Sequence, residues 1–274
     1  MFVGRDVGKH ERTNPFCDQL ALANSAYAGF RGRRLVYLHS GEPTAPLMEF
    51  VHDSFRALVL GSRFSCVGAK AAIRGGAYRV GLYEALGSTE ASAGLARDLF
   101  SFVEEQGDPG GTFTPFVAFF TGPNFADEAD FERLLWAQLQ LLHEADRPHH
   151  HWDPSVSADP EDPQFAFSFA ERAFFVVGLQ PASSRFARRF AWPTLVFNSH
   201  HQFDRLREEG RYERMQEVIR SREVKLQGTL NPNLADFGVR SEARQYSGRP
   251  AEEGWRCPFR AGGGQNHSNK EDVQ

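Results

Sequence analysis

Apolar residues recur along this chain with a spacing of three and four positions in three segments, and this spacing is typical of helices with one buried face. The predicted helices cover Leu47–Leu60, Ala91–Glu104 and Ala126–Ala145. The first is expected to place Phe50, Val51, Phe55 and Leu58 on one inward face. Each of the three segments is therefore expected to form an ordinary helix that packs against the core.

Continuous aromatic and β-branched runs, by contrast, are typical of buried strands. Such runs cover Leu35–Leu38, Thr112–Phe120, Phe165–Ala170, Ala173–Leu179 and Thr194–Asn198. Only Glu171 and Arg172 separate the third run from the fourth, so these two are expected to form a β-hairpin with that dipeptide as its turn. Strands that meet as a hairpin, with helices grouped around them, indicate an α+β fold with a mainly antiparallel central sheet.

The remaining segments are more polar. A short helix is expected within Gln19–Ala28 and a strongly charged helix over Phe203–Arg222. Four prolines exclude regular structure from the acidic loop Asp146–Pro163, and Gly, Pro, Asn and Ser predominate after Gln227. The sequence thus predicts a single domain over residues 1–260 and a disordered tail over residues 261–274.

Charge and cysteine content narrow the possible partners. The chain carries 31 Lys and Arg against 35 Asp and Glu, a net charge of −4, with the two signs interspersed. It lacks the basic patch that nucleic-acid binding requires, and no window approaches a membrane-spanning length of apolar residues. The charged N-terminal residues do not resemble a signal peptide, so we expect a cytoplasmic protein with neither nucleic acid nor membrane as a partner. Cys17, Cys66 and Cys257 are too far apart to suggest a disulfide framework.

The segment from residue 165 to residue 202 combines aromatic side chains, clustered arginines and a pair of histidines. A haem pocket needs these three ingredients: apolar walls, cations for the propionates and an axial ligand. Arg185, Arg188 and Arg189 could bind carboxylates or propionates with forked hydrogen bonds, although surface ion pairs explain the same spacing. The segment is therefore a candidate cofactor site.

Several residues could bind a metal ion. His200 and His201 follow the strand predicted at 194–198, so one of them could point into a pocket at the strand edge; a structural histidine is the alternative. The histidines at 149–151, with Asp153, could supply part of a two-histidine, one-carboxylate iron site, or could be a solvated loop. Cys257 could be a thiolate ligand of haem or an inert buried thiol.

A series of short segments, in order along residues 112–259, resembles the YqcI/YcgG family, and more specifically its haem-dependent N-hydroxylase branch of the guanitoxin-biosynthesis type. The segments are WDPSVSADP, FAFSFAERAFFVVGL, SSRFARRF, FNSHHQF, LNPNLADFG, SEARQYSGR and WRCPF. The resemblance implies haem b, an L-arginine substrate converted to Nω-hydroxy-L-arginine in antibiotic biosynthesis of the D-cycloserine type, and O2 with an external reductase, or hydrogen peroxide, as the oxidant. The chain departs from the family pattern at Glu171, where glycine is usual, and at Gln180, where histidine is frequent.

The resemblance also suggests roles for individual residues. The family pattern Phe-Asn-x-His-x-Gln-Phe falls on residues 197–203, which favours His200 as the axial ligand of the haem iron, with Cys257 or His150 as alternatives. The residues expected to contact the cofactor are Arg185, Arg188 and Arg189 at the propionates and Phe165, Phe167 and Phe175 along the macrocycle. Glu242, or failing that Asp159, is expected to hold the substrate guanidinium by charge-assisted hydrogen bonds.

Two other functions stay open on the sequence. One is a non-haem iron oxygenase that uses the loop around His149–Asp153, and the other is a haem-binding or sensing protein without turnover. The sequence also leaves open whether the substrate is free arginine or another guanidino compound. It leaves open the oligomeric state as well, with a homodimer among the alternatives.

Overall fold

The computed structural model describes residues 12–32, 34–107 and 114–262. In these residues seven strands form one sheet in the order β2-β1-β3-β4-β7-β6-β5. The strands are β1 (Ala28–Arg31), β2 (Arg34–Tyr37), β3 (Arg79–Ala85), β4 (Phe116–Gly122), β5 (Phe167–Phe169), β6 (Arg172–Leu179) and β7 (Thr194–Ser199). Neighbouring strands are antiparallel except β3 and β4, which are parallel. The predicted α+β fold with a mainly antiparallel sheet is confirmed.

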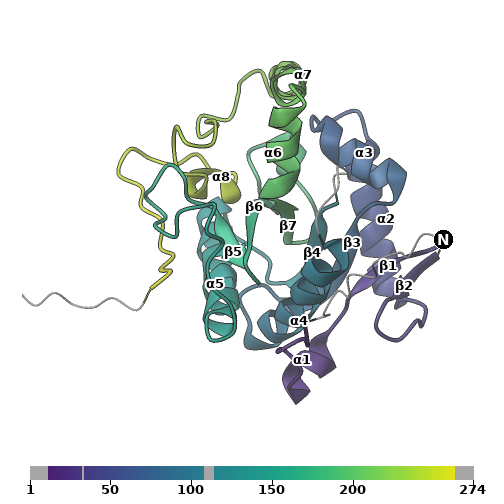
Figure 1. Cartoon of the computed structure of the whole chain (residues 1–274). Coiled ribbons are helices and arrows are strands. Elements are labelled where there is room, and N and C mark those ends of the chain that lie inside the picture. The colour runs from purple at the N-terminus through teal and green to yellow at the C-terminus, as the bar shows by residue number, and fades with distance from the viewer. Residues whose placement is uncertain (1–11, 33, 108–113, 263–274) are drawn as a thin grey trace, which may run out of the picture.

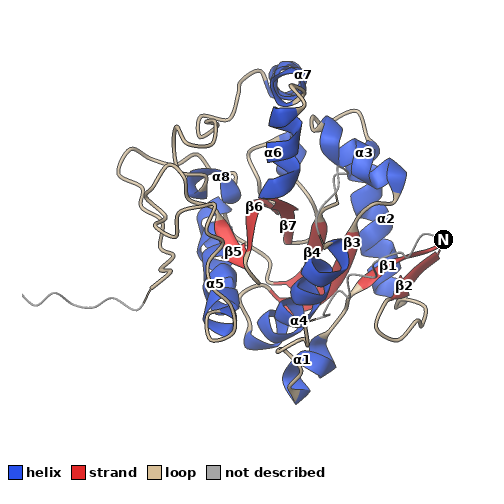
Figure 2. Cartoon of the chain, in the orientation of Figure 1, coloured by secondary structure: helices blue, strands red, loops and turns tan. Residues whose placement is uncertain are grey.

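Helices cover both faces of this sheet (Figures 1 and 2). The helices are α1 (Gln19–Asn24), α2 (Pro46–Leu60), α3 (Val67–Gly75), α4 (Thr89–Gln106), α5 (Glu128–Asp146), α6 (His200–Glu208), α7 (Tyr212–Gln227) and α8 (Ala243–Tyr246), with a 3-10 turn η1 (Phe186–Arg188). Buried residues of α4 and α5 pack on one face in a large aromatic core, and those of α2 and α3 pack on the other. None of the described helices has the length and apolar character needed to cross a membrane.

The three predicted packing helices are confirmed as α2, α4 and α5, but one detail of α2 is wrong. Phe50 is 62% exposed, and its ring packs edge-on against Trp192. The helix instead buries the stripe Met48, Val51, His52, Phe55 and Val59. Residues of one buried face recur every three or four positions, and Phe50 is at neither spacing from any residue of this stripe, so it lies on another face of the helix.

The predicted hairpin is present as β5 and β6, but its turn lies one residue earlier than expected. Ala170 and Glu171 form the turn with φ values of 52° and 62°, and Arg172 already pairs with Phe169 as the first residue of β6. Positive φ at both central residues is typical of the tight type I′ turn. Glycine adopts this backbone region more readily than any residue with a side chain, so Ala170 and Glu171 hold a less favourable conformation here.

The charged helix predicted over Phe203–Arg222 is wrong as a single element. The structure divides it into α6 and α7 around Gly210, whose φ is +64°. The strand predicted over Thr112–Phe120 is β4, which begins at Phe116; Thr112 and Phe113 lie outside the described residues. The predicted tail also lies outside the described residues, apart from Ala261 and Gly262.

Close packing of α1 on α4 depends on Gly94. A Cβ atom at this position would lie 2.0 Å from the backbone oxygen of Asn24, which cannot move without shifting α1. We therefore expect Gly94→Ala to lower the free energy of unfolding by about 1–3 kcal/mol or more, measured by urea denaturation. Gly75→Ala is the matched control, because no atom lies within 4 Å of a Cβ there. It should stabilise the protein by up to about 1 kcal/mol, and equal destabilisation by both variants would contradict this account.

Candidate functional site

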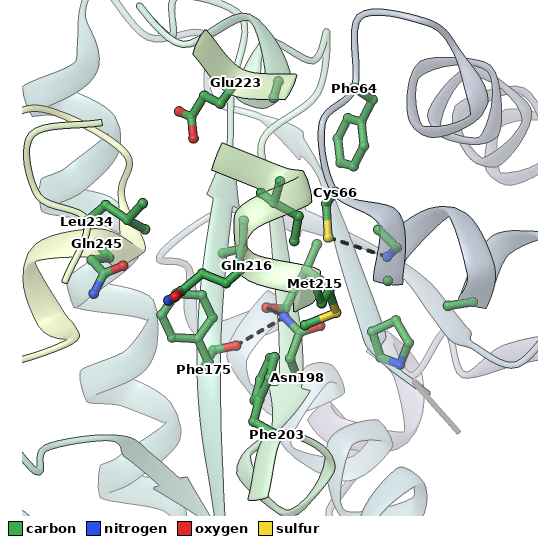
Figure 3. A pocket seen from close by; sticks show the side chains of 18 of the residues that line it. Phe64, Cys66, Phe175, Asn198, Phe203, Met215, Gln216, Glu223, Leu234 and Gln245 are labelled. Carbon is green, nitrogen blue, oxygen red and sulfur yellow. Dashed lines mark hydrogen bonds between the residues drawn. The ribbon is translucent and has the colours of Figure 1, made fainter. Parts of the chain in front are cut away.

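A cavity of about 270 Å³ lies on the face of the sheet that carries α2 and α3, between α3 on one side and α6 and α7 on the other (Figure 3). Side chains of β4, β6 and β7 form its floor, among them Val117, Val177 and Val196. Its aromatic walls are formed by Phe55, Phe64, Phe175, Phe203, Tyr212 and Phe237. The lining is thus mainly apolar, as is usual for sites that bind small molecules or cofactors.

Helix α7 covers this cavity with a single stripe of residues. The cavity-lining positions of α7 are Tyr212, Met215, Gln216, Ile219, Arg220 and Glu223. They recur at helical spacing and hence share one face. No residue of α7 is fully buried, so this helix contributes to the wall of the cavity more than to either core.

The polar centre of the site is a buried pair formed by His200 and Glu242. His200 opens α6 directly after β7, and its Nε2 lies 2.9 Å from Oε2 of Glu242; their side chains are 4% and 8% exposed. The His200 ring also packs edge-on against Phe237 and Phe203, two residues of the cavity wall. The other carboxylate oxygen of Glu242 has no hydrogen-bond partner among the described residues, although Glu242 lines the cavity. This oxygen keeps contact with the cavity space, so it can accept a hydrogen bond from a ligand that brings a donor.

Of the three amide side chains that line the cavity, Asn198 and Gln245 are anchored to backbone oxygens and add further acceptors. Asn198 donates its Nδ2 hydrogens to the backbone oxygens of Phe175 (3.2 Å) and Val196 (3.3 Å), and Gln245 donates from Nε2 to the oxygen of Ala235 (3.1 Å). These bonds fix the orientation of both amides, and within the described part of the chain their oxygens accept no hydrogen bond. An apolar ligand has no hydrogen-bond donors, so it would leave these acceptor oxygens without partners.

Positive charge enters the lining from α6 and α7. The guanidinium of Arg207 lies over the rings of Tyr212 and Phe237, with its carbon 4.6 Å and 5.8 Å from the ring centroids. Arg220 donates to Asp236 at 3.0 Å, and its buried Nε lacks a partner within the described ranges. Both arginines line the cavity and could pair with carboxylates of a bound cofactor or substrate.

Cys66 is a cavity residue to which sequence reasoning gave no role. It caps α3, where its Sγ accepts a hydrogen bond from the backbone N–H of Ala69 at 3.5 Å (Figure 3). Burial raises the pKa of this thiol. A single cysteine carries no sequence signal of its own, and only the position of α3 beside the sheet brings it into the cavity.

The structure brings some of the predicted site residues to the cavity. Phe175 and Glu242 line it, and His200 adjoins it through the contacts described above. Phe165 and Phe167 lie in the aromatic core on the opposite face of the sheet, where each packs against Trp152 and Phe259. Phe175 therefore shares no wall with the other two predicted phenylalanines.

None of the three predicted propionate-binding arginines lines the cavity. Arg185 forms an ion pair with Glu223 and bonds Thr229. Arg188 donates to the backbone oxygens of Gly178 and Tyr246, and burial lowers its pKa to about 10. Arg189 bonds the oxygen of Ser183 and lies over the ring of Phe186. The turn at η1 sends the three side chains in different directions, which adjacency in the sequence does not reveal.

The alternative ligands and the alternative carboxylate lie away from the cavity as well. Asp159 is exposed and accepts a hydrogen bond from the backbone of Glu161. His150 bonds Asp146 at 2.7 Å. Cys257 is 1% exposed in the aromatic core, where burial raises its pKa to about 12. Across residues 12–32, 34–107 and 114–262, no three His, Cys, Asp or Glu side chains are grouped so that they could hold a metal ion.

Comparison with known proteins gives one match. The model of the YqcI/YcgG family matches residues 55–260, a range that contains every residue lining the cavity. No curated protein and no solved structure matches the chain significantly.

The environments of the three cysteines predict an order of reactivity. Cys17 is exposed, Cys66 is half-buried at the cavity and Cys257 is buried in the core. Near neutral pH, Cys17 should be alkylated first, and Cys257, with a pKa of about 12, about a thousandfold more slowly than an ordinary thiol. Peptide mass spectrometry after timed alkylation measures these rates, with urea-unfolded protein as the control in which all three should react alike. Labelling of native Cys66 as fast as Cys17 would show that its thiol is not protected.

Proposed function

The chain belongs to the YqcI/YcgG family, and on this premise we propose that it is a haem-dependent N-hydroxylase that converts L-arginine to Nω-hydroxy-L-arginine. The observation that carries the proposal is the buried carboxylate of Glu242, which lines an aromatic cavity and keeps one oxygen without a partner among the described residues. A guanidinium has only donors and a permanent positive charge, so it complements this group. The proposed setting is antibiotic biosynthesis of the D-cycloserine type, as the sequence resemblance implies.

Aromatic and cationic residues of the cavity lining support haem b as the proposed cofactor. Phe175, Phe203 and Phe237 offer apolar contact for a macrocycle, and Arg207 and Arg220 offer cations for its propionates. Haem would supply the oxidising chemistry, with either O2 and electrons from a separate reductase or hydrogen peroxide as the oxidant.

His200 is our proposed axial ligand. Its ring contacts with Phe203 and Phe237 place it at the cavity wall, and Cys66 is the alternative ligand from the lining itself. The Nε2 atom of His200 cannot bond Glu242 and bind iron at once. If His200 binds iron through Nε2, both carboxylate oxygens of Glu242 become available to the substrate.

The role of Glu242 follows from the chemistry of the substrate. A guanidinium stays protonated at neutral pH, so its nitrogens are poor nucleophiles and its oxidation depends on close positioning. Two charge-assisted hydrogen bonds from one carboxylate fix both the position and the plane of the group. The apolar walls exclude water, which strengthens these bonds.

The first test is an absorption spectrum of protein produced with a haem precursor, recorded before and after addition of L-arginine. We expect a Soret band that arginine perturbs, because the guanidinium would bind beside the cofactor. Product formation is then measured by mass spectrometry with a reductase system and, separately, with hydrogen peroxide. A protein without a Soret band despite ample haem supply would refute the proposed cofactor.

Variants of the buried pair separate the two proposed roles. His200→Ala should alter the Soret band or abolish haem binding, because it removes the proposed ligand. Glu242→Gln should keep the Soret band but need about tenfold to hundredfold more arginine for the same spectral change, since it loses a charged hydrogen bond. Stoichiometric haem with an unchanged spectrum in His200→Ala would exclude His200 as the ligand. Unchanged arginine affinity in Glu242→Gln would exclude Glu242 as the guanidinium site.

A further inference from the structure

The short helix α8 divides its side chains between the two faces of the sheet. Ala243 and Tyr246 belong to the aromatic core, and the Tyr246 ring stacks on Trp136. Glu242 and Gln245 line the cavity. Glu242 has helical backbone angles, and residues three apart on a helix are neighbours on its surface, so these two side chains lie next to each other.

The surroundings of α8 hold this pair in place. The hydroxyl of Tyr246 donates to the backbone oxygen of Phe174 and accepts from the backbone N–H of Phe167, both at 3.0 Å, which ties α8 to β6 and β5. Arg188 donates to the backbone oxygen of Tyr246 at 2.8 Å. A ligand that bonds Glu242 and Gln245 therefore meets acceptors whose supporting backbone is already fixed, which reduces the loss of conformational entropy on binding.

Gln245 is only 4% exposed, and its oxygen accepts no hydrogen bond in the part of the chain that the structure describes. Its Nε2 is held by the backbone oxygen of Ala235, so a rotation of the amide that exchanged the two atoms would lose that bond. The side chain thus offers an oriented, neutral acceptor beside the charged acceptor of Glu242.

We infer that Gln245 is a specificity-determining residue, which together with Glu242 selects a guanidinium over an ammonium ion of the same charge. The inference rests on the proposed function for the identity of the substrate. A guanidinium is planar and presents its N–H donors in a fixed fork, so adjacent nitrogens can bond the Glu242 carboxylate and the Gln245 amide oxygen together. An ammonium carries its three donors on one compact, strongly hydrated nitrogen, so it lacks the planar fork that sets two N–H groups side by side for the two acceptors.

The test compares binding of L-arginine and L-lysine to the haem-loaded, full-length protein by isothermal titration calorimetry. Gln245→Met removes the amide oxygen with little change in size, and we expect arginine affinity to fall about tenfold to hundredfold while lysine affinity changes little. Gln245→Glu keeps an acceptor at this position, so arginine should still bind more tightly than lysine. Circular dichroism and thermal unfolding confirm that each variant is folded.

Gln216→Met is the matched control, because Gln216 also lines the cavity with its Nε2 bonded to a neighbour, Asp236, but lies on α7 and not beside Glu242 on α8. It should leave the preference for arginine over lysine unchanged. An unchanged preference in Gln245→Met, or an equal loss in Gln216→Met, would overturn the role of Gln245 while leaving the proposed function intact. Wild-type protein that binds haem but neither amino acid would overturn both.

Discussion

The alternation of side chains along β6 and β7 is the constraint on which the rest of the structure depends. Successive residues of a strand point to opposite faces of a sheet. Phe174 and Phe197 consequently enter the aromatic core under α4 and α5, whereas Phe175 and Asn198 face the cavity. A shift of one residue in the register would exchange these sets and place an amide in the core. The register of the two strands thus separates a dry core from a cavity that contains polar groups.

The same constraint explains why the polar groups of the site gather at one end of the cavity. β7 ends at Ser199, and the chain continues directly into α6, so His200 emerges next to Asn198 at the edge of the cavity floor. α8 packs on β6 from the side and brings Glu242 within hydrogen-bond distance of His200. Segments more than forty residues apart in the sequence thereby share one buried hydrogen bond.

The sequence predicted the parts of this arrangement that depend on local patterns. Helical spacing located α2, α4 and α5, and the aromatic runs located the hairpin and β7. The position of His200 directly after a strand was a local signal too, and it led to a residue beside the cavity. Phe165 and Phe167, in contrast, share a segment with Phe175 but lie on the other face, because the face is decided by register and by the turn at Ala170 and Glu171. Cys66, Arg207 and Arg220 reach the cavity through the packing of α3, α6 and α7, and periodicity carries no information about such packing.

The charged and polar groups of the cavity lining determine which ligands the cavity favours. One oxygen of Glu242 is bonded to His200, and a cation that brings several N–H groups can bond the other oxygen and the amide oxygens of the lining. In a region of low dielectric constant these hydrogen bonds are stronger than in water. A neutral ligand would add no charge opposite to that of Glu242, whose partner is His200, and an anion would be repelled by it. Arg207 and Arg220 favour negative groups where α6 and α7 line the cavity. The lining as a whole therefore suits a ligand that carries both signs of charge, as an amino acid with a cationic side chain does.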